Sequence, residues 1–169
     1  MSDTEGDKTA YERIKEKKTL KEVLAVAASF EESARDFYRD LASKVGKNIR
    51  WLVEELADEE QRHTDLFLRL AEQPDLEAEL KTLVEVPATY SRFSDCIHLP
   101  DLGEHPDDQS ILQYAMGRED IAMKHYVALA QRTEPGPIRD LFQFLAHEET
   151  EHKRELEKVY YELIHSGGV

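Results

Sequence analysis

Residues 56–63 read LADEEQRH and residues 145–152 read LAHEETEH, so one eight-residue pattern recurs 89 positions later. Each copy holds a glutamate with a histidine three positions further on, Glu60 with His63 and Glu149 with His152. Residues three apart lie on one face of an α-helix. Each copy therefore predicts a helix that presents a carboxylate and an imidazole side by side.

A second duplicated pattern precedes each copy of the first. Residues 31–42 and 119–130 share the pattern E-x-x-A-x-x-x-Y-x-x-L-A. It places Glu31 two helical turns before Tyr38, and Glu119 two turns before Tyr126. The chain thus consists of two related halves that carry the same polar groups in the same order.

Four segments have apolar residues at spacings of three and four, at about 20–45, 48–73, 108–133 and 138–165, as amphipathic helices do. The prolines, which break helix interiors, are confined to 74–106 and 135–137. Thr19 and Glu22 have capping-box spacing at the start of the first segment. No stretch alternates with period two for long enough to predict a strand. The sequence therefore predicts an all-α, four-helix bundle.

The connections between these segments predict how the helices run. The first and last links are only a few residues long, so each should join an antiparallel hairpin. The central link, about 74–107, is longer than bundle connections usually are. We expect a crossover there that makes the second and third helices parallel, with a short helix at 76–84. Residues 1–18 are predicted to be a charged flexible arm, and residues 19–166 one domain.

The duplicated polar residues interrupt the apolar stripes of all four predicted helices. They are Glu31, Glu60, His63, Glu119, Glu149 and His152. Burying four ionised glutamates in an apolar core costs a large amount of folding free energy unless their charges are balanced. No lysine lies in the stripes, and Arg118 is about 100° away from its stripe. Two divalent cations would balance the four carboxylates, and this ligand mixture suits iron or manganese and can also hold zinc. The sequence predicts a buried two-metal site.

Several polar neighbours of these residues are predicted to have no role in the site. Glu59 and Glu148 adjoin the proposed ligands but are rotated about 100° around the helix. His125, His147 and His165 lie off the main stripes, so we expect them at the surface or the rim.

Composition excludes some partners of this 169-residue chain. Its 22 basic and 36 acidic residues give a net charge of −14, which repels nucleic acid. No apolar run is long enough to cross a membrane. One cysteine excludes an intramolecular disulfide, and no signal-peptide pattern is present. These features favour a cytoplasmic protein.

Residues 29–38 (SFEESARDFY), 57–63 (ADEEQRH) and 149–152 (ETEH) resemble the ferritin-like di-iron domain of rubrerythrins, over about residues 20–165. The resemblance implies two iron ions per chain, bridged by Glu60 and Glu149. It also implies terminal ligands, Glu31 with His63 and Glu119 with His152, and leaves open which histidine serves which ion. Tyr38 and Tyr126 would donate hydrogen bonds to ligand carboxylates, unless they are ordinary core tyrosines.

This sequence departs from the rubrerythrin pattern in two respects. Rubrerythrins add a rubredoxin module with four cysteine ligands, whereas this chain has one cysteine. Electrons would then come from an external donor such as rubredoxin. The family also has an extra glutamate on the third helix that joins the metal during turnover, and Ala122 stands there in this chain.

The resemblance implies an oxidoreductase, a di-iron oxidase or peroxidase that consumes O₂ or H₂O₂ and is a homodimer. Iron oxidation for storage or delivery, as in ferritins, is a second interpretation. A helical interaction protein with a structural zinc site is a third. Hydroxylation of an organic substrate ranks last because the sequence shows no clear substrate channel.

Overall fold

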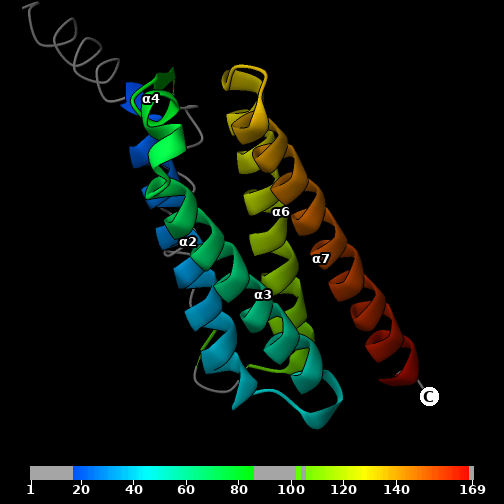
Figure 1. Cartoon of the computed structure of the whole chain (residues 1–169). Coiled ribbons are helices and arrows are strands. Elements are labelled where there is room, and N and C mark those ends of the chain that lie inside the picture. Colours follow the sequence, from blue (N-terminus) through cyan, green and yellow to red (C-terminus); the bar gives the residue numbers. More distant parts are fainter. Residues whose placement is uncertain (1–16, 86–101, 104–105, 168–169) are drawn as a thin grey trace, which may run out of the picture.

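The computed structural model describes residues 17–85, 102–103 and 106–167. Its long helices are α2 (Leu20–Ala42), α3 (Lys47–Ala71), α6 (Asp108–Arg132) and α7 (Pro137–Gly167) (Figure 1). Their bounds agree with the predicted segments to within three residues. The all-α, four-helix bundle is therefore confirmed.

Side chains and backbone contacts fix where these helices begin. The Thr19 side chain accepts a hydrogen bond from the Glu22 amide at 3.2 Å, as the capping-box spacing predicts. Asp107 caps α6 in the same way. The Gly46 amide donates to Asp108 Oδ1 at 3.1 Å, so the start of α3 is tied to the start of α6. A Cβ atom at Gly46 would lie 2.7 Å from the Asp108 carboxylate, which explains the glycine.

The helices form two antiparallel hairpins, α2 with α3 and α6 with α7. Helices α3 and α6 run in the same direction (Figure 1). This parallel arrangement is the one that the long central link predicts.

The described part of this crossover contains elements that the sequence analysis missed. A 3₁₀ turn (Pro74–Leu76) leads into α4 (Glu77–Leu80), and then into β2 (Leu83–Glu85). Strand β2 pairs antiparallel with β1 (Lys17–Thr19). The predicted short helix was therefore right for four residues only, and the expectation that there would be no strand was wrong. Strands of three residues are too short to show an alternating pattern.

Residues 1–16 of the predicted arm and residues 86–101 of the crossover lie outside the described residues. Among the helices that the structure describes, none has the length and apolar character needed to cross a membrane.

The buried apolar side chains form two clusters, one toward each end of the bundle. Leu24 and Phe142 belong to the cluster near the start of α2 and α7. Leu52 and Leu112 belong to the cluster near the start of α3 and α6. The duplicated glutamates and histidines lie between the two clusters, so apolar packing isolates them from both ends.

Candidate metal centre

All four long helices contribute a buried carboxylate at mid-bundle, and two of them add a histidine. Each of these residues is less than a tenth exposed: Glu31 on α2, Glu60 and His63 on α3, Glu119 on α6, and Glu149 and His152 on α7. The structure thus brings all six predicted ligand residues together, because equivalent positions in the two hairpins face the same interior.

These side chains form two overlapping groups whose ligand atoms lie within 4.8 Å of one another. One group contains Glu31 and His63, and the other contains Glu119 and His152. Glu60 and Glu149 belong to both groups. The arrangement has the form of two neighbouring cation sites that share two carboxylates.

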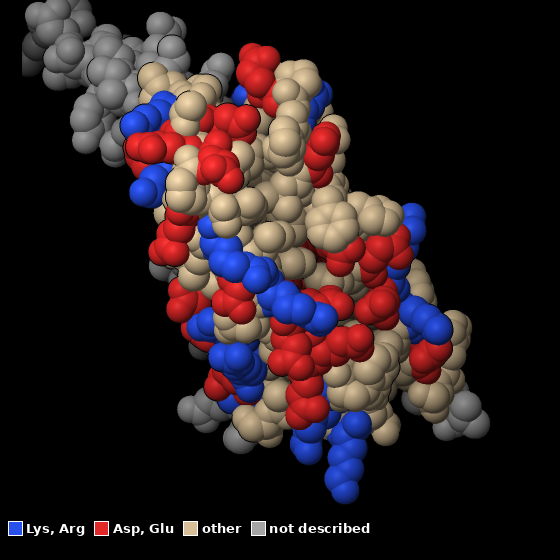
Figure 2. Space-filling view, viewed as in Figure 1, with Lys and Arg blue, Asp and Glu red and all other residues tan. Residues whose placement is uncertain are grey.

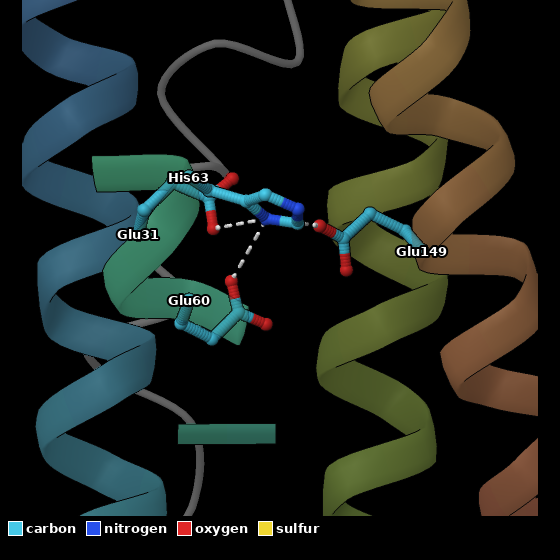
Figure 3. Close-up of side chains that lie close together, drawn as sticks. All are labelled: Glu31, Glu60, His63 and Glu149. Atoms are coloured by element: carbon cyan, nitrogen blue, oxygen red, sulfur yellow. Dashed lines mark ion pairs between the residues drawn. The ribbon is translucent and has the colours of Figure 1, made fainter. Parts of the chain in front are cut away.

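The histidine Nδ1 atoms face the carboxylate oxygens. His63 Nδ1 lies 3.5 Å from Glu31 Oε2, 3.5 Å from Glu60 Oε2 and 3.8 Å from Glu149 Oε1 (Figure 3). Ligand atoms that share one ion at about 2.1 Å are about 3.0–3.4 Å apart at ordinary coordination angles. The cluster therefore needs only small side-chain movements to hold an ion.

The second histidine has matching surroundings in the other group. His152 Nδ1 lies 3.4 Å from Glu149 Oε2, 3.6 Å from Glu119 Oε2 and 4.0 Å from Glu60 Oε1. The two imidazole rings are nearly parallel, with centroids 6.1 Å apart. The two histidines therefore serve different groups.

Several of these inward-facing atoms are buried without a hydrogen-bond partner among the described residues. They are Oε2 of Glu31, Oε2 of Glu60, Oε1 of Glu149, and Nδ1 of His63 and His152. Buried polar atoms nearly always have partners in folded proteins. Five such atoms that converge on one place fit a pair of metal ions, since ions would satisfy all of them.

The tyrosines of the duplicated pattern connect the two hairpins. Tyr38 on α2 donates a hydrogen bond to Glu119 on α6, and Tyr126 on α6 donates one to Glu31 on α2. Both tyrosines are buried. Each hydroxyl therefore orients a glutamate of the opposite hairpin, which is the hydrogen-bonding arrangement that the rubrerythrin resemblance implies.

The four glutamates differ in their affinity for a proton. Burial and neighbouring carboxylates raise the pKa of Glu60 and Glu149 well above the usual range. Burial also opposes ionisation of Glu119, but contacts with Glu149, His152 and Tyr38 outweigh it and lower the pKa of Glu119 to about 2. The pKa of Glu31 is lowered for similar reasons.

The histidine and tyrosine pKa values are raised. Burial disfavours the imidazolium form, but Glu31 outweighs this effect at His63 and raises its pKa. Carboxylates do the same at His152, with Glu119 contributing most. Burial and nearby carboxylates raise the pKa of Tyr38 and Tyr126 well above the usual range. Both hydroxyls therefore stay protonated at neutral pH and act as hydrogen-bond donors.

Glu59 is closer to the site than the sequence analysis predicts. Its carboxylate contacts Nε2 of His152, the ring nitrogen opposite the one that faces the glutamates. Such a contact fixes the orientation of a metal-binding imidazole. Its counterpart in the second half, Glu148, has no ion pair with His63. The expectation that both are bystanders is wrong for Glu59.

One more expectation was wrong, that for His125, and the burial of a second residue, Arg118, was not predicted. His125 is 1% exposed rather than at the surface or rim, and burial lowers its pKa to about 3. Arg118 is 5% exposed, and its guanidinium carbon lies 4.5 Å from the centroid of the Phe37 ring. Arg118 also lines a small cavity beside Glu60 and Glu149. A helix that packs against two neighbours buries a wider arc than one stripe, so residues about 100° off the stripe can still be buried.

The site has an exposed side between α3 and α7. An open pocket of about 540 Å³ reaches His63, and Glu59, Arg62 and Glu148 lie among its walls. Acidic and basic side chains are interspersed over these helices on the face shown in Figure 2. His63 is therefore the proposed ligand that a solute reaches most directly from this side.

The chain is similar to known proteins in sequence and in fold. The family model described as Rubrerythrin matches residues 22–160. The chain is also similar in structure to a Thermotoga maritima protein assigned to the ferritin-like diiron-carboxylate proteins. That comparison has a TM-score of 0.63 and 23% sequence identity, and covers 86% of this chain and 96% of the other. At this identity the likeness shows the fold. A search of curated proteins finds no significant match.

Proposed function

This chain belongs to the rubrerythrin family, and we propose that it is a di-iron oxidoreductase that reduces hydrogen peroxide or dioxygen. The proposal depends on one observation above all, the two ligand groups that share Glu60 and Glu149. A pair of ferrous ions held there would supply two electrons, enough to cleave the O–O bond of hydrogen peroxide or to reduce dioxygen to hydrogen peroxide. Hydrogen peroxide takes up two electrons and two protons and yields two molecules of water.

We assign the metal ligands as follows. Glu31 and His63 would hold one ion, Glu119 and His152 would hold the other, and Glu60 and Glu149, which belong to both groups, would be shared by the two. Two divalent ions match the charge of the four carboxylates, which makes their burial tolerable. Iron is the metal that the family membership favours, while the same donor atoms accept manganese or zinc.

The residues around the ligands position them and limit access of water. Tyr38 and Tyr126 hold the terminal glutamates of the opposite hairpin through hydrogen bonds. Glu59 holds His152 through Nε2. The apolar clusters close the interior to water at both ends, which strengthens electrostatic interactions inside it.

Ala122 leaves this chain without the additional glutamate that rubrerythrins use during turnover. We therefore propose that both histidines remain ligands in both oxidation states. Crystal structures of the oxidised and reduced metal-loaded protein test this point. A metal–histidine distance that changes by more than about 1 Å, half a normal bond length, would contradict a rigid site.

Stopped-flow mixing tests the proposed reaction. Protein loaded anaerobically with ferrous ion is mixed with H₂O₂ or O₂, with and without rubredoxin and its reductase. We expect one oxidation event without the donor and repeated turnover with it. The Glu60→Ala variant, which lacks a proposed bridge, serves as the control for free iron.

Other outcomes identify a different function. Progressive oxidation of excess ferrous ion, together with a large shell on a sizing column instead of the expected homodimer, would indicate iron storage. Zinc retained from both iron-fed and zinc-fed cultures, with no reaction toward oxidants, would indicate a structural site. Either result would overturn the oxidoreductase proposal.

A further inference from the structure

Three aromatic rings form a continuous path of contacts from the proposed metal centre toward the surface. Tyr38 donates a hydrogen bond to the proposed ligand Glu119, and its ring meets that of Phe37 with centroids 5.1 Å apart. The Phe37 ring meets that of Tyr114 on α6, again with centroids 5.1 Å apart. Aromatic rings at such distances are in contact. Tyr38 is 1% exposed, whereas Phe37 and Tyr114 are partly exposed.

The internal repeat does not account for the outer two rings of this path. The position equivalent to Phe37 in the second half holds His125, and the position equivalent to Tyr114 in the first half holds Val26. The duplicated ligands and tyrosines are therefore compatible with residues other than these two rings. Phe37 and Tyr114 extend the contacts of Tyr38 outward without being part of the duplicated pattern.

Arg118 influences which of these rings can give up an electron. Its guanidinium carbon lies 4.5 Å from the centroid of the Phe37 ring, in a cation–π contact. A positive charge beside a ring makes removal of an electron from that ring less favourable. Phe37 therefore suits the role of a bridge between the two tyrosines, which are easier to oxidise than phenylalanine.

We infer that Tyr38, Phe37 and Tyr114 form an electron-transfer path, and that Tyr114 supplies one electron when the centre holds only one ferrous ion. The inference rests on the proposed function. A single ferrous ion alone reduces hydrogen peroxide by one electron, and the products are hydroxide and a hydroxyl radical. An electron from Tyr114 completes the reduction, so that hydroxyl radical is not released.

The electrons and protons of this step balance. Hydrogen peroxide takes up one electron from the ferrous ion, one from Tyr114 and two protons, and yields two molecules of water. The ferrous ion becomes ferric, and Tyr114 becomes a neutral tyrosyl radical after its hydroxyl proton passes to the solvent. Tyr38 relays the electron, while its own proton moves along the hydrogen bond to Glu119 and back. A soluble one-electron reductant then restores Tyr114.

The path and the open pocket involve different pairs of helices. The three rings lie on α2 and α6, whereas the pocket that reaches His63 lies between α3 and α7. A reductant can therefore reach Tyr114 without entering the pocket through which a solute approaches His63.

Freeze-quench electron paramagnetic resonance tests the path. Metal-free protein receives one or two ferrous ions per chain anaerobically, and is then mixed with hydrogen peroxide in the absence of an electron donor. We expect a tyrosyl radical in the sample with one ion. The sample with two ions should contain at least tenfold less radical, because two ferrous ions supply both electrons. Protein that carries ring-deuterated tyrosine identifies the signal through its changed hyperfine splitting.

Two variants interrupt the path at different points. Tyr114→Phe keeps the ring but removes the hydroxyl group, and Phe37→Leu removes the bridging ring. In both variants the radical should remain on the buried Tyr38, so ascorbate should remove it at least tenfold more slowly than in the wild type. The control is Tyr161→Phe, which changes an exposed tyrosine of α7 whose ring contacts Tyr160. Its radical yield and decay should match the wild type.

The possible failures are distinguishable. The path alone is overturned if wild-type protein binds two irons that peroxide oxidises, but one ferrous ion gives no radical or ascorbate removes the radical equally fast in either folded variant. Wild-type protein that binds fewer than two ions per chain, or whose ferrous ions do not react with peroxide, would overturn the proposed function and the path with it.

Discussion

The glutamates of the site ionise at unequal cost because their neighbours differ. Burial disfavours the ionised forms of Glu60 and Glu149, and neighbouring carboxylates add to this effect, so the pKa of each is raised. The pKa of His63 and of His152 is also raised, because the surrounding carboxylates favour the imidazolium form. All four groups therefore retain protons to a higher pH than they would in an unfolded chain.

Metal binding should therefore strengthen as the pH rises. A metal ion requires ionised carboxylates and neutral imidazoles, so binding releases the protons that these four groups hold. Each proton released raises the metal affinity about tenfold per pH unit while the group is still protonated. Anaerobic titrations with ferrous ion at pH 6, 7 and 8 measure this dependence. An affinity that stays constant across this range would contradict the raised pKa values.

Glu59 and Glu148 occupy equivalent positions in the repeat but differ in their contacts. Only Glu59 meets a histidine Nε2 atom, that of His152. Loss of such a contact typically weakens metal affinity about 10–100-fold. We expect this loss in Glu59→Ala, whereas Glu148→Ala should bind metal nearly as the wild type does. Metal titration of the two variants decides the point, and equal affinities would show that the Glu59 contact does not orient His152.

Sequence patterns predicted the six inward-facing residues because each motif occurs twice, once in each half of the chain. A motif that indicates little alone is more informative when it recurs at an equivalent position. One E-x-x-H motif is common on exposed helices, but two copies in matching gaps of apolar stripes indicate a shared interior. The same reasoning missed Arg118, His125 and Glu59. It assumed one buried stripe per helix, whereas each helix of this bundle is covered on more than one side.

At the scale of the elements, local signals predicted the helices well and the crossover poorly. Proline positions, Gly46 and the Thr19 cap mark the helix ends in the sequence itself. The ribbon of β1 and β2 depends on pairing between residues far apart in the chain, such as Lys18 with Val84. A three-residue strand with a distant partner leaves no periodic signal in the sequence.

The cap at Thr19 gives a test at this scale. Thr19→Ala removes the acceptor for the Glu22 amide, and loss of an N-cap acceptor costs about 1 kcal/mol. For a domain of this size we expect the melting temperature to fall by about 2–4 °C. Thr19→Ser keeps the acceptor oxygen and should unfold close to the wild-type temperature. Thermal unfolding followed by circular dichroism measures both variants, and equal melting temperatures would exclude a stabilising role for the cap.

At the scale of the whole molecule, the polar centre connects the two hairpins between the two apolar clusters, each of which contains side chains of both hairpins. Glu31 and Tyr38 reach across to Tyr126 and Glu119 of the other hairpin. The proposed ions would take ligands from all four long helices. Metal binding should therefore stabilise the association of the hairpins as well as the ligands themselves.

This connection predicts a large effect of metal removal on stability. Without ions, the four glutamates repel one another in a dry interior unless some take up protons, and both alternatives cost free energy. A ligand at one hundred times its Kd stabilises the folded state by about 2.7 kcal/mol per site. For a domain of this size one such site corresponds to a rise in melting temperature of about 5–11 °C.

The measurement is an anaerobic titration of metal-free protein with ferrous ion, followed by thermal unfolding at each step. We expect the melting temperature to rise until two ions are bound per chain, because each ligand group contains its own histidine and terminal glutamate. The Glu60→Ala variant removes an oxygen donor from both groups at once, so its melting temperature should respond weakly to iron. A plateau at one ion per chain would contradict the paired arrangement, since it would mean that the second group of carboxylates and histidine binds no metal.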